Sequence, residues 1–326
     1  MEERYFFAIR DFVEMIFNDN HNDGMALDSD KAARDFQRFL QICYADDEDF
    51  CLLLICAGFI PDLYEADSSE ETLYSKLVEV LVCEWARRIG FYSVYVKEKG
   101  SYEDGRIIIN NKVVVCDAKS FRLGRSQKAP NVKDFLKLED IRKWLSRHQN
   151  GLGGLVVYPD THEWTSSSDA YQYCSTKNAP TLMLPFKYLA LLLAFKKRYN
   201  TNTLEALWDY NRMFPSALTK KRGVSNKIEY WNVINKKIKT LLGITDEEFN
   251  RYIAYADKHI ENCVIANLKY LEAYKSNIIE TIKEEISKID EDELRKMFIE
   301  YKIESETNVL SGYIVRIYDF RLKNNG

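Results

Sequence analysis

A run of apolar residues ends in two opposite charges at positions 117 and 119. Val113 to Cys116 is continuously apolar, which is typical of a strand buried on both faces. Asp117 and Lys119 are separated by one residue, so on a strand they lie on the same face. Charges at the end of a buried strand are costly unless they have partners or a metal ion. The pattern therefore indicates a site that can do polar chemistry.

A predicted hairpin brings a second carboxylate to the same place. The Asn110–Asn111 pair lies between two β-branched runs, and asparagine tolerates the positive φ of a tight turn. With a two-residue turn there, Ile109 pairs with Lys112. Counting back along both strands then sets Asp104 directly opposite Asp117, with Cβ atoms roughly 4.5–5.5 Å apart. Two carboxylates at that spacing repel each other unless one is protonated or a divalent cation lies between them.

This set of residues resembles the active site of PD-(D/E)xK nucleases. In that arrangement Asp104 and Asp117 bind Mg²⁺, which takes oxygen ligands and keeps several waters. The ion polarises the scissile phosphate and lowers the pKa of a bound water, while Lys119 orients that water or stabilises the pentacovalent phosphate. One more acid often comes from a neighbouring helix, and we expect Glu71. The alternative is a structural one, in which Asp117 and Lys119 form a surface salt bridge.

Helices are predicted on both sides of a group of strands. Residues 1–60 carry apolar positions at helical spacing, and another helix begins near Ser68 with an N-cap signal and stops at Gly90. Short β-branched and aromatic runs predict strands at 91–96, 106–110, 112–120, 153–159 and 181–185. Further helices are expected at 132–148, at 186–198 and from about Leu204 nearly to the end. The predicted fold class is α/β (α+β): a central mixed β-sheet of PD-(D/E)xK nuclease type, flanked by helices, with helical N-terminal and C-terminal parts.

Three regions are expected within one compact unit. They are an N-terminal helical region (1–60), a PD-(D/E)xK catalytic core (61–200) and a helical C-terminal region (201–326). The last region binds DNA, forms a dimer interface or completes the core; the sequence leaves these alternatives open. With 326 residues and 46% hydrophobic content, the chain can bury a sizeable core.

Composition also limits the location of the protein. No apolar run reaches the roughly 20 residues that a membrane span needs, and the acidic N-terminus lacks the pattern of a signal peptide. Seven cysteines without motif spacing fit thiols in a reducing compartment. We therefore expect a cytoplasmic, prokaryotic-type, nucleoid-associated protein with no membrane contact.

Charge is distributed unevenly along the chain. The net charge of −4 argues against nucleic-acid binding by the protein as a whole. The segment from residue 119 to residue 147, however, contains nine Lys or Arg and three acidic residues. The segment from residue 196 to residue 239 contains eleven Lys or Arg and three acidic residues. Basic faces on an acidic protein can hold phosphates while limiting non-specific binding. The alternative is that both are ordinary solvated helix faces.

A longer stretch around the predicted site resembles a known family. Residues 117–125 read DAKSFRLGR, similar to the active-site segment DAKSFRLSR of the HindIII-type type II restriction endonucleases. Similarity extends over roughly residues 60–240. It includes residues 61–76 (PDLYEADSSEETLYSK), 133–135 (KDF), 188–193, 207–208 and 219–225.

The resemblance implies a double-strand cleavage activity. It predicts a Mg²⁺-dependent homodimer that hydrolyses both strands of DNA at a short palindromic site, with host DNA protected by a cognate DNA methyltransferase. The namesake's site, AAGCTT, is our expectation for the sequence cut. Asp134 matches another family acid near the site and is an expected metal ligand, or else a helix N-terminal residue. The family has Gly where this chain has Glu103, and its loop before Lys133 is shorter, with Ala129–Pro130 as the insertion here.

DNA contacts are expected from the loop after the site and from a basic segment further on. Asn and Gln can bond adenine bidentately and Lys can reach guanine, so we expect base contacts from Ser126, Gln127, Lys128 and Asn131. Phosphate contacts are expected from Arg122, Arg125, Lys220, Lys221 and Arg222. Lys133 completes the expected DNA-binding set. The alternative is a polar loop with solvated charges.

Two other functions remain compatible with these residues. One is another PD-(D/E)xK DNA nuclease, from repair or a mobile element, that recognises DNA structure. The other is a non-catalytic DNA-binding protein in which the acid pair is only a salt-bridge site. Discrete fragments from a plasmid of known sequence separate a restriction enzyme from both.

Overall fold

The computed structural model describes residues 3–23, 27–96, 102–127, 129–160, 164, 168, 170–174, 176–213 and 226–317. The chain divides into two compact units, Met1–Ala266 and Asn267–Gly326. The first unit contains the β-sheet and the helices that cover it. The three-region division of the chain stays a prediction.

A five-stranded mixed sheet forms the centre of the first unit. Its order is β2-β3-β4-β6-β7, antiparallel from β2 to β4 and parallel from β4 to β7. The strands are β2 (Tyr92–Tyr95), β3 (Gly105–Ile109), β4 (Lys112–Ala118), β6 (Gly151–Tyr158) and β7 (Thr181–Pro185). Each falls where a β-branched run predicted a strand, so the expected central mixed sheet is confirmed.

The hairpin between β3 and β4 has the predicted register. Ile109 pairs with Lys112, and the ladder continues to Gly105 opposite Cys116. Asn110 and Asn111 have φ values of 48° and 64°, the left-handed conformation that a two-residue hairpin turn requires. The turn therefore sets which residues of the two strands meet at the far end of the hairpin.

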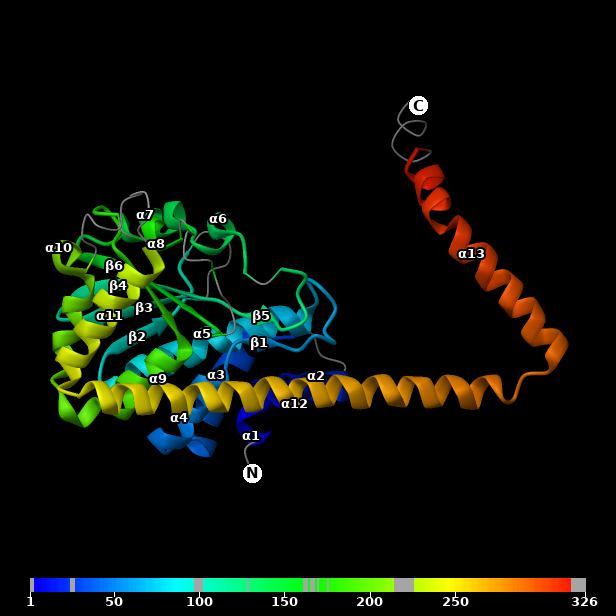
Figure 1. The fold of residues 1–326 in the computed structure, drawn as a ribbon, viewed down its shortest axis with the longest axis horizontal. Helices are drawn as coiled ribbons and strands as arrows, with labels where there is room; N and C mark the ends of the chain where they lie inside the picture. The colour runs from blue at the N-terminus through cyan, green and yellow to red at the C-terminus, as the bar shows by residue number, and fades with distance from the viewer. Residues whose placement is uncertain are drawn as a thin grey trace. The chain divides into compact units, whose positions relative to one another are not determined.

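Helices cover both faces of this sheet (Figure 1). The added Cβ of Gly105 would meet Cys83 of α5 (Ser69–Ile89), whereas that of Gly154 would meet Ile141 of α7 (Leu138–Leu145). Gly105 and Gly154 point to opposite faces, because paired strands share the alternation of side chains. Accordingly, α5 packs on one face and α7 on the other.

α5 has the boundaries that the sequence signals predicted. Ser68 Oγ accepts a hydrogen bond from the Glu71 N–H at 3.2 Å, which caps the first turn. Gly90 ends the helix with φ 106°, a left-handed conformation that glycine adopts at little cost. The remaining helices of the N-terminal part are α1 (Glu3–Phe6), α2 (Ala8–Asp23), α3 (Ser29–Cys43) and α4 (Asp47–Ile55).

The single helix expected at 132–148 is wrong. The structure has two short helices instead, α6 (Val132–Phe135) and α7, with Lys137 in a non-helical conformation between them. Leu136 and Leu138 are both buried. In one continuous helix these two side chains would point about 200° apart, since each residue turns by about 100°. The break lets both reach the core.

A second, two-stranded sheet was not predicted. β1 (Phe59–Ile60) pairs in parallel with β5 (Phe121–Arg122). The Phe121 N–H also donates to the Gly58 carbonyl at 2.8 Å. These contacts tie the chain just after Lys119 to the segment that precedes α5.

The C-terminal part of the first unit completes its core. Short elements follow β6 and β7: α8 (Ala170–Tyr173), α9 (Phe186–Ala194), η1 (Lys196–Arg198), η2 (Thr201–Trp208) and α10 (Tyr210–Met213). Tyr230 of α11 (Asn226–Leu242) is fully buried, and its hydroxyl bonds both the N–H and the carbonyl of Met183 in β7. The first turns of α12 (Asp246–Ile286) bury Phe249, Ala256 and Ile260.

In the part that the structure describes, the second unit contains the end of α12 and α13 (Glu291–Ile317). An apolar stripe runs along its part of α12 and is made of Leu268, Ile278, Ile279, Ile282 and Ile286. Each of these side chains is exposed, from 41% to 54%. At about 100° per residue, all five positions fall within one face of the helix about 100° wide. Within the described residues, this face is not used for the core of the unit.

Two expectations from the composition concern membrane-spanning helices and cysteines. Among the described helices, none combines the length and the apolarity that a bilayer-spanning helix needs. All seven cysteines lie in described parts of the chain, and no disulfide joins them. The expectation of thiols is confirmed.

Candidate active site

Asp117 and Lys119 meet at the end of β4. Asp117 is only 4% exposed, and its Oδ1 lies 2.6 Å from Lys119 Nζ. The Lys119 N–H donates to the Val157 carbonyl of β6 at 2.8 Å, which continues the parallel pairing beyond the strand. The backbone therefore holds both side chains in place.

Asp104 lies beside them, just past the last pair of the β3–β4 ladder. Its N–H donates to the Cys116 carbonyl at 3.0 Å, and its Oδ2 accepts from the Ala118 N–H at 2.8 Å. The predicted closeness to Asp117 is thus achieved by a side-chain hydrogen bond to the opposite strand, at the point where regular pairing ends. Asp104, Asp117 and Lys119 form one cluster, as the sequence indicated.

The two aspartates cannot both carry a charge without help. Burial raises the pKa of Asp104, and the charge of Asp117 raises it further, to about 8, although Lys119 acts in the opposite direction. Asp117 Oδ2 is buried and accepts no hydrogen bond from the described residues. A proton or a cation is needed to stabilise this pair.

Glu79 is a third acid at this site, and the sequence reasoning missed it. Burial raises the pKa of Glu79 well above its usual value, and the charges of Asp104 and Asp117 add to the effect. Lys76 and Lys119 lower it. The Glu79 carboxyl is therefore within electrostatic range of both aspartates, and we call Glu79, Asp104, Asp117 and Lys119 the acidic–lysine site. The available signal was a glutamate between Val78 and Val80 in the apolar middle of a helix.

Glu71, the acid expected to join the pair, has a different environment. It lies eight residues before Glu79 on α5, or about 12 Å along the helix axis. Its Oε2 accepts from the Asp67 N–H at 2.8 Å and lies 3.0 Å from Arg122 Nη2. The structure therefore gives Glu71 a capping and ion-pair role and does not bring it to Asp104.

Arg122, an expected phosphate contact, makes several contacts within the protein. Its guanidinium donates to the carbonyls of Asp62, Tyr64 and Glu65, with distances of 3.3 Å to Asp62 and 3.1 Å to Glu65. With the ion pair to Glu71, it fastens the chain before α5 to β5. This arrangement favours a structural role for Arg122.

The loop that follows presents polar side chains to solvent. Ser126, Gln127 and Asn131 are exposed, and the Asn131 carbonyl accepts from the Phe135 N–H at 3.0 Å at the start of α6. The Arg125 guanidinium lies 4.5 Å from the centre of the Phe121 ring, and burial lowers its pKa. Base contacts from this loop stay a prediction.

Several predicted site residues cannot be placed. Lys128, Lys220, Lys221 and Arg222 lie outside the described residues. The backbones of Lys133 and Asp134 belong to α6, but their side chains are outside the described part. Their expected roles stay predictions.

The donor set of the acidic–lysine site fits Mg²⁺. All its possible ligands are carboxylate oxygens, and Mg²⁺ is commonly held by one or two carboxylates with waters completing the octahedron. The Asp117 Oδ2 accepts no hydrogen bond from a donor group of the described residues, and the pKa of Asp104 is raised. A bound cation would account for both observations. Over the part of the chain that is described, no three acidic, His or Cys side chains already form a complete ion cage. The fit therefore rests on the Asp104–Asp117 pair.

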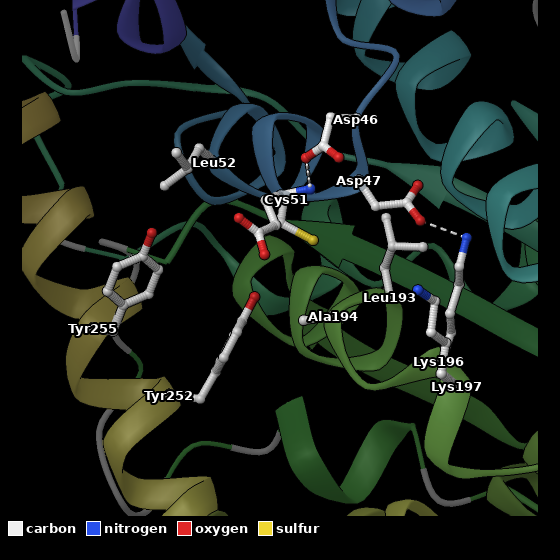
Figure 2. Close-up of a pocket in the computed structure, with 11 residues that line it drawn as sticks. Asp46, Asp47, Cys51, Leu52, Leu193, Ala194, Lys196, Lys197, Tyr252 and Tyr255 are labelled. Carbon is white, nitrogen blue, oxygen red and sulfur yellow. Dashed lines mark hydrogen bonds and ion pairs between the residues drawn. The ribbon is translucent and has the colours of Figure 1, made fainter.

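A cavity of about 480 Å³ lies elsewhere in the first unit (Figure 2). It is lined by residues of α4, α9, η1 and α12, among them Cys51, Tyr252 and the Asp47–Lys196 ion pair, whose Oδ2 and Nζ are 2.5 Å apart. None of the residues of the acidic–lysine site lines it. It is therefore a separate feature of the fold.

Comparison with known proteins agrees with this geometry. The sequence profile of the HindIII restriction endonuclease family matches residues 11–313, which include the whole acidic–lysine site. The Type II restriction enzyme HindIII of Haemophilus influenzae (strain ATCC 51907 / DSM 11121 / KW20 / Rd) is 25% identical over 217 residues, 65% of this chain and 68% of that enzyme. The profile match covers nearly the entire sequence. This chain therefore belongs to the HindIII restriction endonuclease family, a family of site-specific nucleases that act on DNA.

Proposed function

We propose that the protein is a Mg²⁺-dependent type II restriction endonuclease that cuts both strands of DNA at a short palindromic site. The observation that carries this proposal is the buried Asp104–Asp117 pair with the Lys119 ammonium 2.6 Å from Asp117 Oδ1. Family membership supports DNA as the substrate. As the sequence cut, we propose AAGCTT, by similarity to the namesake alone.

The residues of the site have distinct roles in this proposal. Asp104 and Asp117 hold the cation, and Glu79 supplies a third carboxyl within electrostatic range of them. Bound Mg²⁺ would polarise the scissile phosphate and lower the pKa of a water. Lys119 donates hydrogen bonds from its ammonium group to the attacking water or to the phosphate oxygens, where negative charge develops.

The proposal includes a two-fold homodimer, because a palindrome presents the same half-site on each strand. The apolar stripe on α12 supports self-association, since exposed apolar stripes on helices commonly mark protein interfaces. A cognate DNA methyltransferase is proposed as the functional partner that protects host DNA. Asp134 remains a proposed additional acid near the site.

Digestion of a plasmid of known sequence tests the activity directly. With Mg²⁺, the protein is expected to give discrete fragments whose mapped ends share one palindromic sequence. Asp117→Asn and Lys119→Ala are expected to abolish cutting while a labelled duplex still binds, because neither change removes a residue of the expected DNA-contact loop. Smears or junction-specific cuts would favour a structure-recognising nuclease. No Mg²⁺-dependent cutting, with DNA binding intact, would favour a non-catalytic DNA-binding protein.

A further inference from the structure

Glu103 is a buried acid directly before Asp104 in the chain. Its side chain is 0% exposed. Its Oε1 lies 3.2 Å from Nε2 of His148 and also accepts a short hydrogen bond from Arg106 Nε. Burial raises the pKa of Glu103, but a hydrogen bond from its own backbone and those from Arg106 and His148 outweigh burial, so the pKa is below its usual value. The carboxylate is therefore charged and has two cationic or polar partners.

A second contact joins the same two segments. The Arg147 guanidinium lies 4.2 Å from the centre of the Tyr102 ring, a cation–π geometry. Residues 147 and 148 lie in the turn after α7, and their N–H groups donate to the carbonyls of Trp144 and Leu145 in that helix, which packs on β4 and β6. Tyr102 and Glu103 are thus held by a turn that is bonded to a helix fixed to the sheet.

Asp104 has anchors on the opposite side of this segment. Its N–H and Oδ2 bond the β4 backbone, and its carbonyl accepts from the Val96 N–H at 3.1 Å. The regular β3–β4 ladder ends at Gly105, so strand pairing alone does not fix residues before it. The Glu103 contacts supply a restraint at the point where that pairing stops.

We infer that Glu103 is a positioning residue that, through His148, fixes the segment carrying Asp104 so that its carboxylate can share a divalent cation with Asp117. The inference rests on the proposed function, since it takes Asp104 as a metal ligand. Partners that orient a metal ligand typically contribute 10–100-fold to metal affinity. In this protein the partner is Glu103, and it restrains the backbone next to the proposed metal ligand Asp104.

A charge effect must be separated from positioning, because Glu103 is itself an anion near the cation site. The two effects differ when His148 is changed. His148→Ala leaves the Glu103 charge in place but removes one of its anchors. Positioning predicts weaker cation binding, whereas a pure charge effect predicts unchanged or tighter binding. The His148 side chain is 16% exposed and lies in the turn after α7, so thermal unfolding is used to verify that His148→Ala is folded before its Mn²⁺ binding is compared.

The experiment measures Mn²⁺ binding to the full chain without DNA, by the electron paramagnetic resonance signal of free Mn²⁺. Glu103→Ala is expected to weaken binding by about tenfold, at the lower end of the range for such partners. His148→Ala should weaken it in the same direction, and the double variant should be no weaker than Glu103→Ala. The control is Glu205→Gln, which removes the charge that pairs with Lys112 and Asn110 at the other end of the same hairpin. Its Mn²⁺ affinity should equal that of the wild type.

Each outcome has one meaning. His148→Ala with wild-type or tighter Mn²⁺ binding, additive losses in the double variant, or an equal loss in Glu205→Gln would each overturn the positioning role. Wild-type protein that binds no Mn²⁺ would instead contradict the proposed function, and with it the inference. If Glu103→Ala does not fold, the comparison of His148→Ala with wild type still decides.

Discussion

The Nζ of Lys119 lies 2.6 Å from Oδ1 of Asp117, although only one residue separates them in the chain. This ion pair stands at the buried end of β4 beside a second acid, Asp104, whose pKa is raised to about 8. A surface salt bridge would not need this burial. At this position Asp104 holds a proton that a bound cation can replace, with an ammonium group close by.

The two glutamates of α5 provide a matched test of the third acid. Glu79→Gln removes a carboxyl whose pKa is raised by the charges of both aspartates. Cleavage is expected to fall by at least about 10-fold, the loss typical when a group that supports metal ligands is removed. Glu71→Gln alters only the helix start and the Arg122 ion pair, and should leave the cleavage rate of folded protein within about 2-fold. Single-turnover cleavage measures both. The reverse ranking would restore Glu71 as the third acid.

Asp104 gives the metal-free protein a specific pH dependence. Because its pKa in the folded state is raised to about 8, the folded protein holds a proton that the unfolded chain loses near pH 4. This contribution to stability is therefore complete at low pH and is lost as pH rises through about 8. Asp104→Asn stays neutral, so at pH 9 it should be more stable than wild type by up to about 6 kcal/mol, which is about 1.4 kcal/mol for each of roughly four pKa units.

Urea unfolding in EDTA at pH 5 and pH 9 measures this difference. The gain of Asp104→Asn should be larger at pH 9 than at pH 5. Equal differences at the two pH values would mean that Asp104 is charged in the folded protein throughout. Added Mg²⁺ should favour the wild type, since asparagine is the poorer ligand.

Arg122 is expected to matter for stability more than for DNA affinity. Arg122→Ala removes a partly buried charge-assisted network to three carbonyls and Glu71, and should cost roughly 2–3 kcal/mol in the free energy of unfolding. Arg142→Ala, which removes an exposed pair with Glu139, is the control and should cost under about 1 kcal/mol. The slope of DNA affinity against salt should not change for folded Arg122→Ala. A flatter slope at unchanged stability would instead identify a phosphate contact.

The apolar stripe on α12 should carry self-association. Two charges placed on it, Ile279→Glu with Ile282→Glu, are expected to convert a dimer to a monomer in light scattering, because both side chains would be buried in the interface. Thr281→Glu is exposed on another face of the same helix and should remain dimeric. A dimer that persists in the isoleucine variant would place the interface elsewhere.

Local signals predicted the hairpin and its two acids. Tertiary contacts decided the third acid, the partners of Arg122 and the small second sheet. The Asn110–Asn111 turn and its β-branched flanks are local, so register and the Asp104–Asp117 proximity followed from the sequence. The third acid depends on which turn of α5 faces the end of β4, and spacing along one helix cannot show this. Hence the sequence reasoning named Glu71 and missed Glu79.

Arg122 and the small second sheet illustrate the same limit. A basic residue within the active-site segment predicted a phosphate contact, but its carbonyl partners come from residues 62–65, far away in the sequence. β1 and β5 have two residues each, too few for a strand pattern to be visible. Only the folded chain shows that these segments lie together.

The central claim is that one divalent cation binds between Asp104 and Asp117. Crystals of the protein soaked in Mn²⁺, with data collected at the manganese absorption edge, locate the ion directly. The account predicts an anomalous peak within bonding distance of oxygens from both aspartates in the wild type, and none there in Asp117→Asn. A wild-type map with no peak between these side chains, or with the same peak in the variant, would contradict it.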